Sequence, residues 1–250
     1  MNSSQGESGI YLSVVVPAYN EQENLPRLVA EVESALKSAG KAWELVLVND
    51  GSTDDSPSVL RRLLAEHLRL RVLSLKRRSG QTAALEAGLR AARGRFLATL
   101  DADLQNDPYD VVRLLPMVEG GECDFVNGWR RRRDDPWLRR LSTRVANAVR
   151  NWLTHEDIRD SACALKVFRR ECVERVKFFN GMHRFLPTLV RMEGYRVAEV
   201  PVSHRARTAG VSKYGVWNRA FRALRDALAV RWMQSRILRY EVEEWRRDDG

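Results

Sequence analysis

Cysteine and histidine are scarce in this sequence. The three cysteines, Cys123, Cys163 and Cys172, cannot build a disulfide framework, and no two of them form a CxxC pair. This usage is typical of a reducing compartment, so we expect a cytoplasmic protein. The four histidines are scattered along the chain and indicate no zinc site.

Long apolar runs are also absent. No stretch reaches the ~18 consecutive apolar residues that a membrane span needs. The first residues, Met1–Gly6, have neither the basic flank nor the apolar run of a signal peptide. Hydrophobic residues make up 44% and charged residues 30% of the 250 residues, which argues against disorder. We therefore expect a flexible start (1–9), one compact domain (10–216) and a C-terminal helical extension (217–250) without a transmembrane span.

Acidic residues are outnumbered by basic ones. The chain has 42 Lys and Arg against 33 Asp and Glu, a net charge of +9. Such an excess indicates an anionic partner, which can be nucleic acid, phospholipid headgroups or a phosphorylated substrate. Nucleic acid is disfavoured, because the sequence shows no helix-turn-helix, RNP or zinc-finger pattern.

The first half of the chain alternates apolar runs with helical patterns. Strands are predicted at 11–16, 43–48, 71–75 and 96–100, and helices at 25–36, 59–68 and 82–92. Nearly continuous apolar strands separated by helices predict an α/β fold, in which helices cover both faces of a mostly parallel sheet. Ligands of such sheets bind beyond the carboxyl ends of the strands.

The second half is less regular. Strands are predicted at 124–129, 164–168 and 196–202, and helices at 138–153 and 184–192, the latter kinked by Pro187. The basic, glycine-containing stretch from His204 to Gly215 is predicted to be a loop, and a helix follows from Asn218.

Each strand of the first half is followed by a polar segment. These segments are Pro17–Glu21 (PAYNE), Asp50–Asp54 (DGSTD), Lys76–Gln81 (KRRSGQ) and Asp101–Gln105 (DADLQ). Taken singly, Asp50 and its neighbours can also form a turn and cap the next helix. Carboxylates one residue apart, such as Asp101 and Asp103, can instead hold a Mg²⁺ or Mn²⁺ ion that bridges phosphates.

Together the segments resemble family 2 glycosyltransferases of the GT-A fold, which has a Rossmann-like, mostly parallel sheet. Two further stretches, Gly80–Leu85 (GQTAAL) and Gly210–Gly215 (GVSKYG), resemble polyprenyl-phosphate sugar synthases of the dolichol-phosphate mannosyltransferase and undecaprenyl-phosphate glycosyltransferase type. The resemblance covers roughly residues 10 to 235. It implies a catalytic domain that binds a nucleotide sugar and a polyprenyl phosphate.

The resemblance assigns a donor site and a metal site. It implies that Asp101, Asp103 and Gln105 contact the metal and the diphosphate, and that Asp50 contacts the nucleoside. The full set of expected donor-binding residues is Pro17, Ala18, Tyr19, Glu21, Asp50, Ser52, Gln81, Asp101, Ala102, Asp103 and Gln105.

Acceptor-phosphate binding is expected from basic residues, because two anionic reactants must be held together. Eight arginines but only two acids lie between Trp129 and Arg150. Arginine binds phosphate through two parallel hydrogen bonds. The resemblance places Arg130, Arg139, Arg140, Arg207, Ser212 and Lys213 at the acceptor phosphate, and Asp103, Asp160, Arg130 and Arg207 in catalysis.

Two of these assignments have competing interpretations. Asp160 lies where the subfamily carries an Asp followed by a glycine, but this chain has Ala162 in the glycine region. A helix cap or a salt bridge to Arg159 or Lys166 would also explain Asp160. His183 resembles a stretch that flanks the same cleft, although a lone histidine is more often structural.

The C-terminal helix is predicted to be amphipathic. On a helical wheel Ala220, Phe221, Leu224, Ala227 and Leu228 share one side, and Arg219, Arg222, Arg225 and Asp226 lie opposite. Such a helix can lie on anionic headgroups, pack on its own domain, or bind a second copy or a membrane protein. We favour peripheral contact with the cytoplasmic face of the membrane, since the acceptor is a lipid.

The function that follows from the resemblance is an inverting, metal-dependent transfer of a hexose from a nucleotide sugar to polyprenyl phosphate. A UDP-sugar is the favoured donor and GDP-mannose a possible one. The alternatives are a same-fold enzyme acting on a soluble glycan or cell-wall precursor, a basic nucleic-acid-binding protein, and a silent sugar-nucleotide scaffold. The intact Asp101, Asp103 and Gln105 argue against the scaffold.

Overall fold

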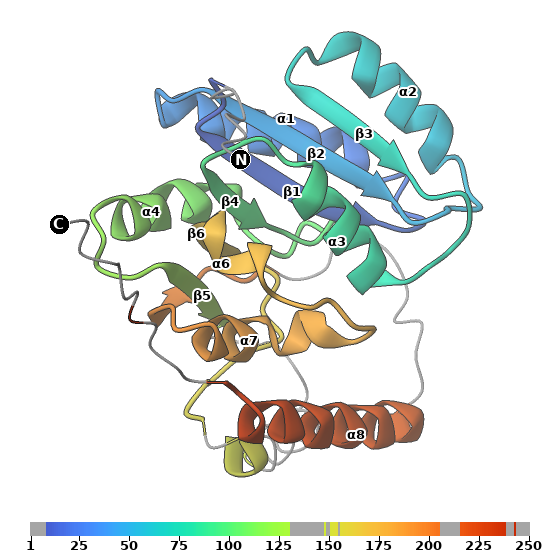
Figure 1. The fold of residues 1–250 in the computed structure, drawn as a ribbon. Coiled ribbons are helices and arrows are strands. Elements are labelled where there is room, and N and C mark those ends of the chain that lie inside the picture. Colours follow the sequence, from blue (N-terminus) through green and yellow to red (C-terminus); the bar gives the residue numbers. More distant parts are fainter. Residues whose placement is uncertain are drawn as a thin grey trace, which may run out of the picture.

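The computed structural model describes residues 9–130, 148, 151–154, 156–205, 216–238 and 243. Its centre is a seven-stranded sheet of order β3-β2-β1-β4-β6-β5-β7 (Figure 1). The strands are β1 (Leu12–Ala18), β2 (Trp43–Asn49), β3 (Leu70–Ser74), β4 (Phe96–Thr99), β5 (Phe125–Arg130), β6 (Lys166–Arg169) and β7 (Val197–Val202). β6 pairs antiparallel with β4 and β5, and the other pairings are parallel. The predicted α/β fold is confirmed.

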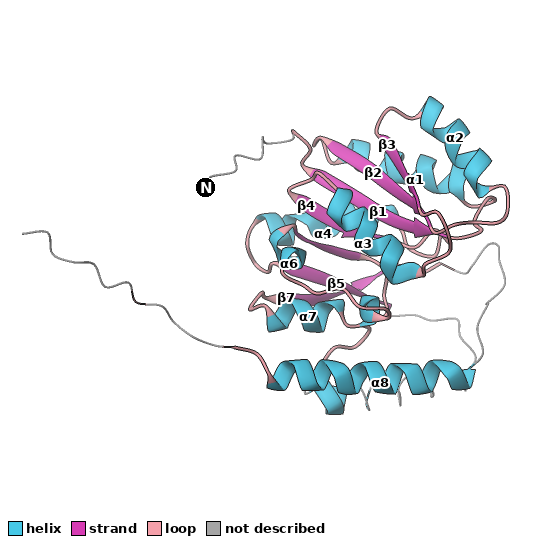
Figure 2. Cartoon of the chain, turned by 45° about the vertical axis from the view of Figure 1, so that its right-hand side comes forward, coloured by secondary structure: helices cyan, strands magenta, loops and turns pink. Residues whose placement is uncertain are grey.

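Helices cover both faces of this sheet (Figure 2). They are α1 (Leu25–Ser38), α2 (Ser56–Glu66), α3 (Gln81–Ala91), α4 (Pro108–Glu119), α6 (Glu171–Glu174), a 3-10 turn η1 (Met182–Arg184), α7 (Leu186–Met192) and α8 (Val216–Ser235). The predicted elements begin and end within a few residues of these bounds. Of the helix predicted at 138–153, the described residues 148 and 151–154 are helical, and the rest lies outside the described part.

One helix was missed and one helix prediction needs correction, and both concern proline. Helix α4 was not predicted, because its first residue is Pro108 and Pro116 interrupts its pattern. Asp107 caps this helix by accepting a hydrogen bond from the Tyr109 N–H. Pro187 does not kink α7 but lies in its first turn, where a backbone N–H would have no helical partner.

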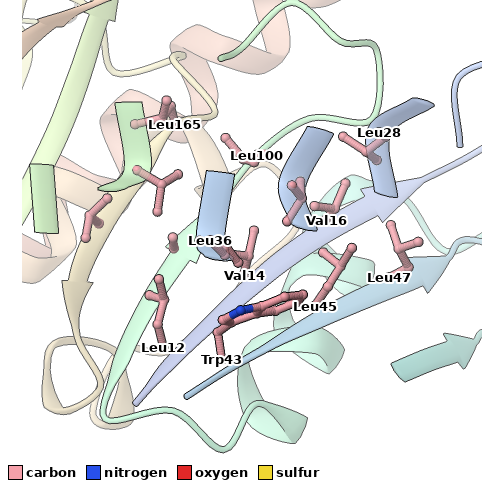
Figure 3. Close-up of a cluster of buried hydrophobic side chains, with 14 of the residues drawn as sticks. Leu12, Val14, Val16, Leu28, Leu36, Trp43, Leu45, Leu47, Leu100 and Leu165 are labelled. Carbon is pink, nitrogen blue, oxygen red and sulfur yellow. The ribbon is translucent and has the colours of Figure 1, made fainter. Parts of the chain in front are cut away.

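The alternation of side chains along β1 builds two separate cores. Leu12, Val14 and Val16 point into a cluster with Leu28 and other residues of α1 and α4 (Figure 3). Val15 points to the other face, into a cluster shared with α3, α7 and α8. Burial of β1 between two helical layers explains why its sequence is almost entirely apolar.

The C-terminal helix α8 packs on the second core. Ala227 and Val230 are buried in that cluster, and the Gln234 side-chain amide donates a hydrogen bond to the Thr154 carbonyl. The predicted apolar side is therefore wrong in part, since Ala227 faces the domain whereas Leu224 and Leu228 are exposed. Within the described ranges, no helix is both long and apolar enough to cross a bilayer.

Candidate active site at the carboxyl edge of the sheet

The loops after β1 and β2 are bound to each other. The Ser52 hydroxyl accepts a hydrogen bond from the Asn20 N–H at 2.9 Å, and the Asn20 side-chain carbonyl accepts one from the Thr53 N–H at 2.8 Å. Asn20 adopts a left-handed conformation with φ of 54°, which asparagine tolerates better than most residues. The Glu21 N–H also donates to the Ser56 hydroxyl. These bonds hold the PAYNE and DGSTD segments side by side.

The Asp50 carboxylate is buried and ties the end of β2 to the start of α3. Its oxygens accept hydrogen bonds from the Ser79 N–H at 2.6 Å and from the Gly80 N–H at 2.9 Å. Gly51, at φ of 63°, lies so close to the chain at Arg78 that an added Cβ would be 2.4 Å from the backbone nitrogen of Arg78. Asp50 thus binds the segment that leads into α3, which neither the turn nor the cap of the next helix anticipated, and contact with a nucleoside stays a prediction.

Arg78 lies over the face of the Tyr19 ring. Its guanidinium carbon is 4.2 Å from the ring centroid, within cation–π range. Pro17 and Ala18 are the last two residues of β1, and Tyr19 follows them directly. An arginine on an aromatic ring presents a flat surface of the kind on which a nucleobase can stack.

The DADLQ segment forms a tight turn after β4. The Asp101 carboxylate accepts a hydrogen bond from the Gln81 side-chain amide at 2.9 Å, and Asp103 Oδ1 accepts one from the Gln105 N–H at 3.2 Å. Leu104 is held at φ of 61°, an unfavourable value for leucine that the buried surroundings impose. Ala102 and Asp103 are buried, and Asp101 is half-buried.

These side chains fit a divalent ion that also binds phosphate. No group of three or more His, Cys, Asp or Glu side chains able to hold a metal occurs in the described part of the chain. Two carboxylates and one amide supply hard oxygen ligands but do not complete a coordination shell. Mg²⁺ and Mn²⁺ sites of this kind take their remaining ligands from water and substrate phosphates.

Gln105 connects the DADLQ turn to the end of β7. Its backbone carbonyl accepts a hydrogen bond from the Arg205 N–H at 2.9 Å, and Asn106 forms a β-bridge with His204. The Arg205 guanidinium is held by Glu31 at 2.6 Å and by Asp107 at 2.9 Å. The segment that leads into the predicted 204–215 loop is thereby anchored beside the DADLQ turn.

Arg130 and Asp160 form a two-pronged ion pair. Arg130 Nε lies 2.7 Å from Asp160 Oδ2 and Nη2 lies 2.9 Å from Oδ1. Burial by itself would lower the pKa of Arg130, but the hydrogen bond and the charge of Asp160 raise that pKa above its ordinary value. A salt bridge at Asp160 was one of the competing predictions, and the partner found is Arg130. Within the described part of the chain, Nε and Nη2 of Arg130 contact Asp160, and Nη1 is the guanidinium nitrogen left that could meet a phosphate oxygen.

Lys166 brings a second positive charge close to the Arg130–Asp160 pair. It is the first residue of β6, opposite Thr99 of β4 and Asn127 of β5, and it is buried. Its ammonium donates to the carbonyls of Ser161 and Cys163. Burial lowers the pKa of Lys166, while the charges of Asp160 and Asp101 act to raise it.

His183 is a structural neighbour of the site. Its Nδ1 lies 2.9 Å from the Thr82 hydroxyl, which also accepts a hydrogen bond from the Gly181 N–H. Burial, together with the nearby charges of Arg184 and Lys166, lowers the pKa of His183 to about 3. The ring is therefore neutral near pH 7 and links the start of α3 to η1.

The structure brings together most, but not all, of the predicted site residues. Arg139, Arg140, Arg207, Ser212 and Lys213 lie outside the described residues. Sequence reasoning missed Arg78 as a neighbour of Tyr19 and Lys166 as a buried cation. The signal for Lys166 was a single charge inside the otherwise apolar run from Ala164 to Phe168.

Comparisons with known proteins agree with this geometry. Residues 13–177 match the model of a family described as glycosyl transferase family 2. A curated relative, the dodecaprenyl-phosphate galacturonate synthase of Rhizobium johnstonii, is 42% identical over 223 residues. That alignment covers 88% of this chain and 66% of the relative, so the chain spans slightly less than two thirds of the relative's length.

Two solved structures share the fold at lower identity. The mannosyltransferase PcManGT of Pyrobaculum calidifontis, in complex with GDP-Man and Mn²⁺, has a TM-score of 0.58 at 24% identity, covering 76% of this chain and 54% of that one. The glucosyl-3-phosphoglycerate synthase of Mycobacterium tuberculosis, in complex with Mn²⁺, UDP and glucosyl-3-phosphoglycerate, has a TM-score of 0.68 at 20% identity, with 93% and 82% covered.

Proposed function

Because this chain belongs to glycosyl transferase family 2, we propose that it transfers a hexose-derived sugar from a nucleotide sugar to a polyprenyl phosphate. The observation that carries the proposal is the meeting of two charge types at one sheet edge. Lys166 of β6 lies opposite Thr99 of β4, two residues before Asp101, and the other neighbour of β6, strand β5, ends at Arg130. The acidic donor side and the basic acceptor side therefore belong to a single site.

The donor side is proposed to bind the nucleotide sugar between the Tyr19–Arg78 pair and the DADLQ turn. A divalent ion on Asp101 and Asp103, Mg²⁺ or Mn²⁺, would neutralise charge on the departing diphosphate. A UDP-sugar remains the favoured donor and GDP-mannose the second candidate. The name of the Rhizobium relative makes galacturonate the first sugar to test.

On the acceptor side, Arg130 is proposed to hold the lipid phosphate through Nη1 while Asp160 fixes its orientation. A phosphate oxygen then attacks the anomeric carbon; the new C–O bond forms as the bond to the diphosphate breaks. A phosphate monoester is already anionic near pH 7, so the site needs no general base. A single displacement of this kind inverts the anomeric configuration.

Transfer to a lipid has to take place where a bilayer presents its phosphate. We therefore propose a peripheral protein of the cytoplasmic membrane face. The competing function, transfer to a soluble glycan or cell-wall precursor, predicts the same donor site but no preference for a lipid acceptor.

A donor and acceptor screen tests the function. Purified protein with Mg²⁺ or Mn²⁺ is offered UDP-galacturonate, other UDP-sugars and GDP-mannose together with polyprenyl phosphate, and nucleoside diphosphate release is measured. We expect release that depends on the lipid and stops with EDTA. Asp103→Asn should lower the rate about 10²-fold, the loss seen when one stabiliser of transition-state charge is removed.

The matched control for that variant is Asp55→Asn. Asp55 is an exposed carboxylate that makes no side-chain cap contact with α2, so this change should leave the rate unaltered. Release that requires a soluble glycan instead of the lipid would support the competing function. Turnover that survives both EDTA and Asp103→Asn would contradict the metal assignment.

A further inference from the structure

The outward face of α8 carries a stripe of large apolar side chains. Leu224, Leu228 and Trp232 follow each other at intervals of four residues, so they share one side of the helix. They are 44%, 51% and 62% exposed. The opposite side is buried against the domain through Ala227 and Val230. The apolar stripe is thus not the face that packs on the core.

Positive charge borders this stripe. Arg225, Arg231 and Arg236 are exposed on the same segment. The acidic residue of α8, Asp226, is turned toward the domain, since an added Cβ at Gly181 would lie 2.6 Å from its carboxylate oxygen. The exposed side of α8 therefore combines apolar residues with arginines that no acid on that side offsets within the described part of the helix.

A second exposed aromatic residue lies near the end of this helix. Trp152 is exposed in the helical turn 151–154, and the Thr154 carbonyl of that turn accepts the hydrogen bond of Gln234 from α8. Figures 1 and 2 agree in placing α8 along the outer side of α7, at the end of the molecule opposite α2. The apolar surface therefore lies at one end of the protein.

We propose that this face of α8, with Leu224, Leu228 and Trp232, docks the protein on an anionic lipid surface. An amphipathic helix lying in the headgroup region buries leucine and tryptophan among acyl chains and places arginine at the phosphates. Each arginine near an anionic leaflet adds electrostatic attraction to the apolar contacts. A second copy of the chain is a poorer occupant, because two such faces would bring their arginines together.

The choice of a lipid as the occupant of this face rests on the proposed function. The exposed apolar face of α8 itself is independent of that function. The helix begins on the side of the sheet toward which the arrowheads of β1, β2 and β3 point in Figure 1. The carboxyl edge of the sheet holds the candidate site, so docking through α8 would keep that edge close to the bilayer surface where the acceptor phosphate lies.

Vesicle sedimentation tests the docking. The full-length protein is mixed with vesicles of phosphatidylcholine and phosphatidylglycerol in equal parts, and with phosphatidylcholine alone. We expect binding to the anionic vesicles that weakens with salt. Leu228→Glu should reduce it about ten-fold or more, since a half-exposed leucine is replaced by a charge that the anionic surface repels.

The control is Leu64→Glu on α2, at the other end of the molecule. Leu64 is 46% exposed, close to the value for Leu228, so both variants make the same chemical change at similar exposure. Leu64→Glu should bind vesicles like the unaltered protein. Both variants should have the unfolding temperature of the unaltered protein, and equal vesicle binding by the two would then overturn the proposal.

Two further measurements separate docking from catalysis and from self-association. Transfer to a short, water-soluble polyprenyl phosphate should be the same in Leu228→Glu and unaltered protein, whereas transfer to long-chain acceptor in vesicles should fall. Vesicle binding without any transfer would leave the docking intact and contradict the proposed function. A lipid-free dimer that Leu228→Glu converts to monomer, with unchanged vesicle binding, would assign the face to a second copy instead.

Discussion

At the scale of single residues, Lys166 is the least expected part of the site. Its ammonium is buried, and the described residues place no carboxylate within ion-pair distance of it. A buried charge without a direct partner is costly and is retained where it serves a purpose. We interpret Lys166 as a positioning residue, which holds the Ser161–Cys163 turn and offsets the charges of Asp101 and Asp160.

Replacement of Lys166 should therefore separate stability from activity. Lys166→Met removes a buried charge, which stabilises, but it also strands two carbonyls, which destabilises by about 1–3 kcal/mol. The opposing terms leave the free energy of unfolding within about 2 kcal/mol of its original value. We expect a loss in kcat of about ten-fold or more, because the site loses a positive charge.

The conservative variant is the control for this change. Lys166→Arg keeps the charge and should recover part of the rate without restoring the original stability, because its larger head must be accommodated. Melting curves and steady-state rates measure the two properties. An unchanged kcat in Lys166→Met would make the lysine purely structural.

His183 provides a stability signal that depends on pH. Its pKa falls from 6.5 to about 3 on folding because the ring is buried. The unfolded chain therefore binds more protons than the folded one between these values, and stability decreases as the pH falls through this window. His183→Gln should make the acid loss of stability shallower, since glutamine keeps a hydrogen bond to Thr82 but does not titrate.

Urea unfolding across the acid range measures this effect. His67→Gln is the control, because it makes the same replacement at a histidine that follows α2 and contacts Glu33. A constant difference in unfolding free energy between the original protein and His183→Gln, from neutral to acid pH, would contradict the assignment.

At the scale of elements, the contact of α3 with the sheet positions the donor side. Gly88 lets this helix approach β1 and β2, since an added Cβ would lie 2.3 Å from Val15 Cγ1 and 2.9 Å from Val48 Cγ2. The first residues of α3, Gln81 and Thr82, reach Asp101 and His183. A displacement of α3 would therefore disturb both contacts.

Gly88→Ala should destabilise the protein although alanine favours helices. Overpacking costs about 1–3 kcal/mol, and the gain in helix propensity returns about 1 kcal/mol. We expect a lower free energy of unfolding and weaker nucleotide binding, measured by denaturant titration and calorimetry. Adding Val15→Ala should recover part of the loss, because it makes room for the new methyl. A more stable Gly88→Ala protein would show that α3 shifts at no cost.

The helices and strands were predictable from the sequence wherever the local pattern of apolar residues matches the burial that the folded protein imposes. Buried strands such as β1 and β2 are apolar at most positions, so their sequence reveals them directly. Helix α4 escaped prediction, because proline opens it and recurs within it. Its burial against α1 and β6 outweighs that local penalty.

At the scale of the whole molecule, the sheet divides into a proposed donor part and a proposed acceptor part. The parallel strands β1 to β4 carry the PAYNE, DGSTD and DADLQ segments at their ends, and β5 to β7 carry Arg130, Lys166 and the segment that binds Gln105. Pairing of β4 with β6 joins these parts in one sheet. The net charge of +9 suits a protein whose proposed substrates are all anionic.

The sequence by itself determined the fold class, the family and the polar segments proposed to bind the donor, because these depend on periodicity and on motifs contained within short stretches. Only the tertiary structure decided that Arg130 pairs with Asp160, that Lys166 is buried beneath them, and that α8 turns Ala227 inward and Leu228 outward. Each of these depends on residues far apart in the chain. A helical wheel shows which side chains share a face, but burial of one face is settled by the surface that packs against it.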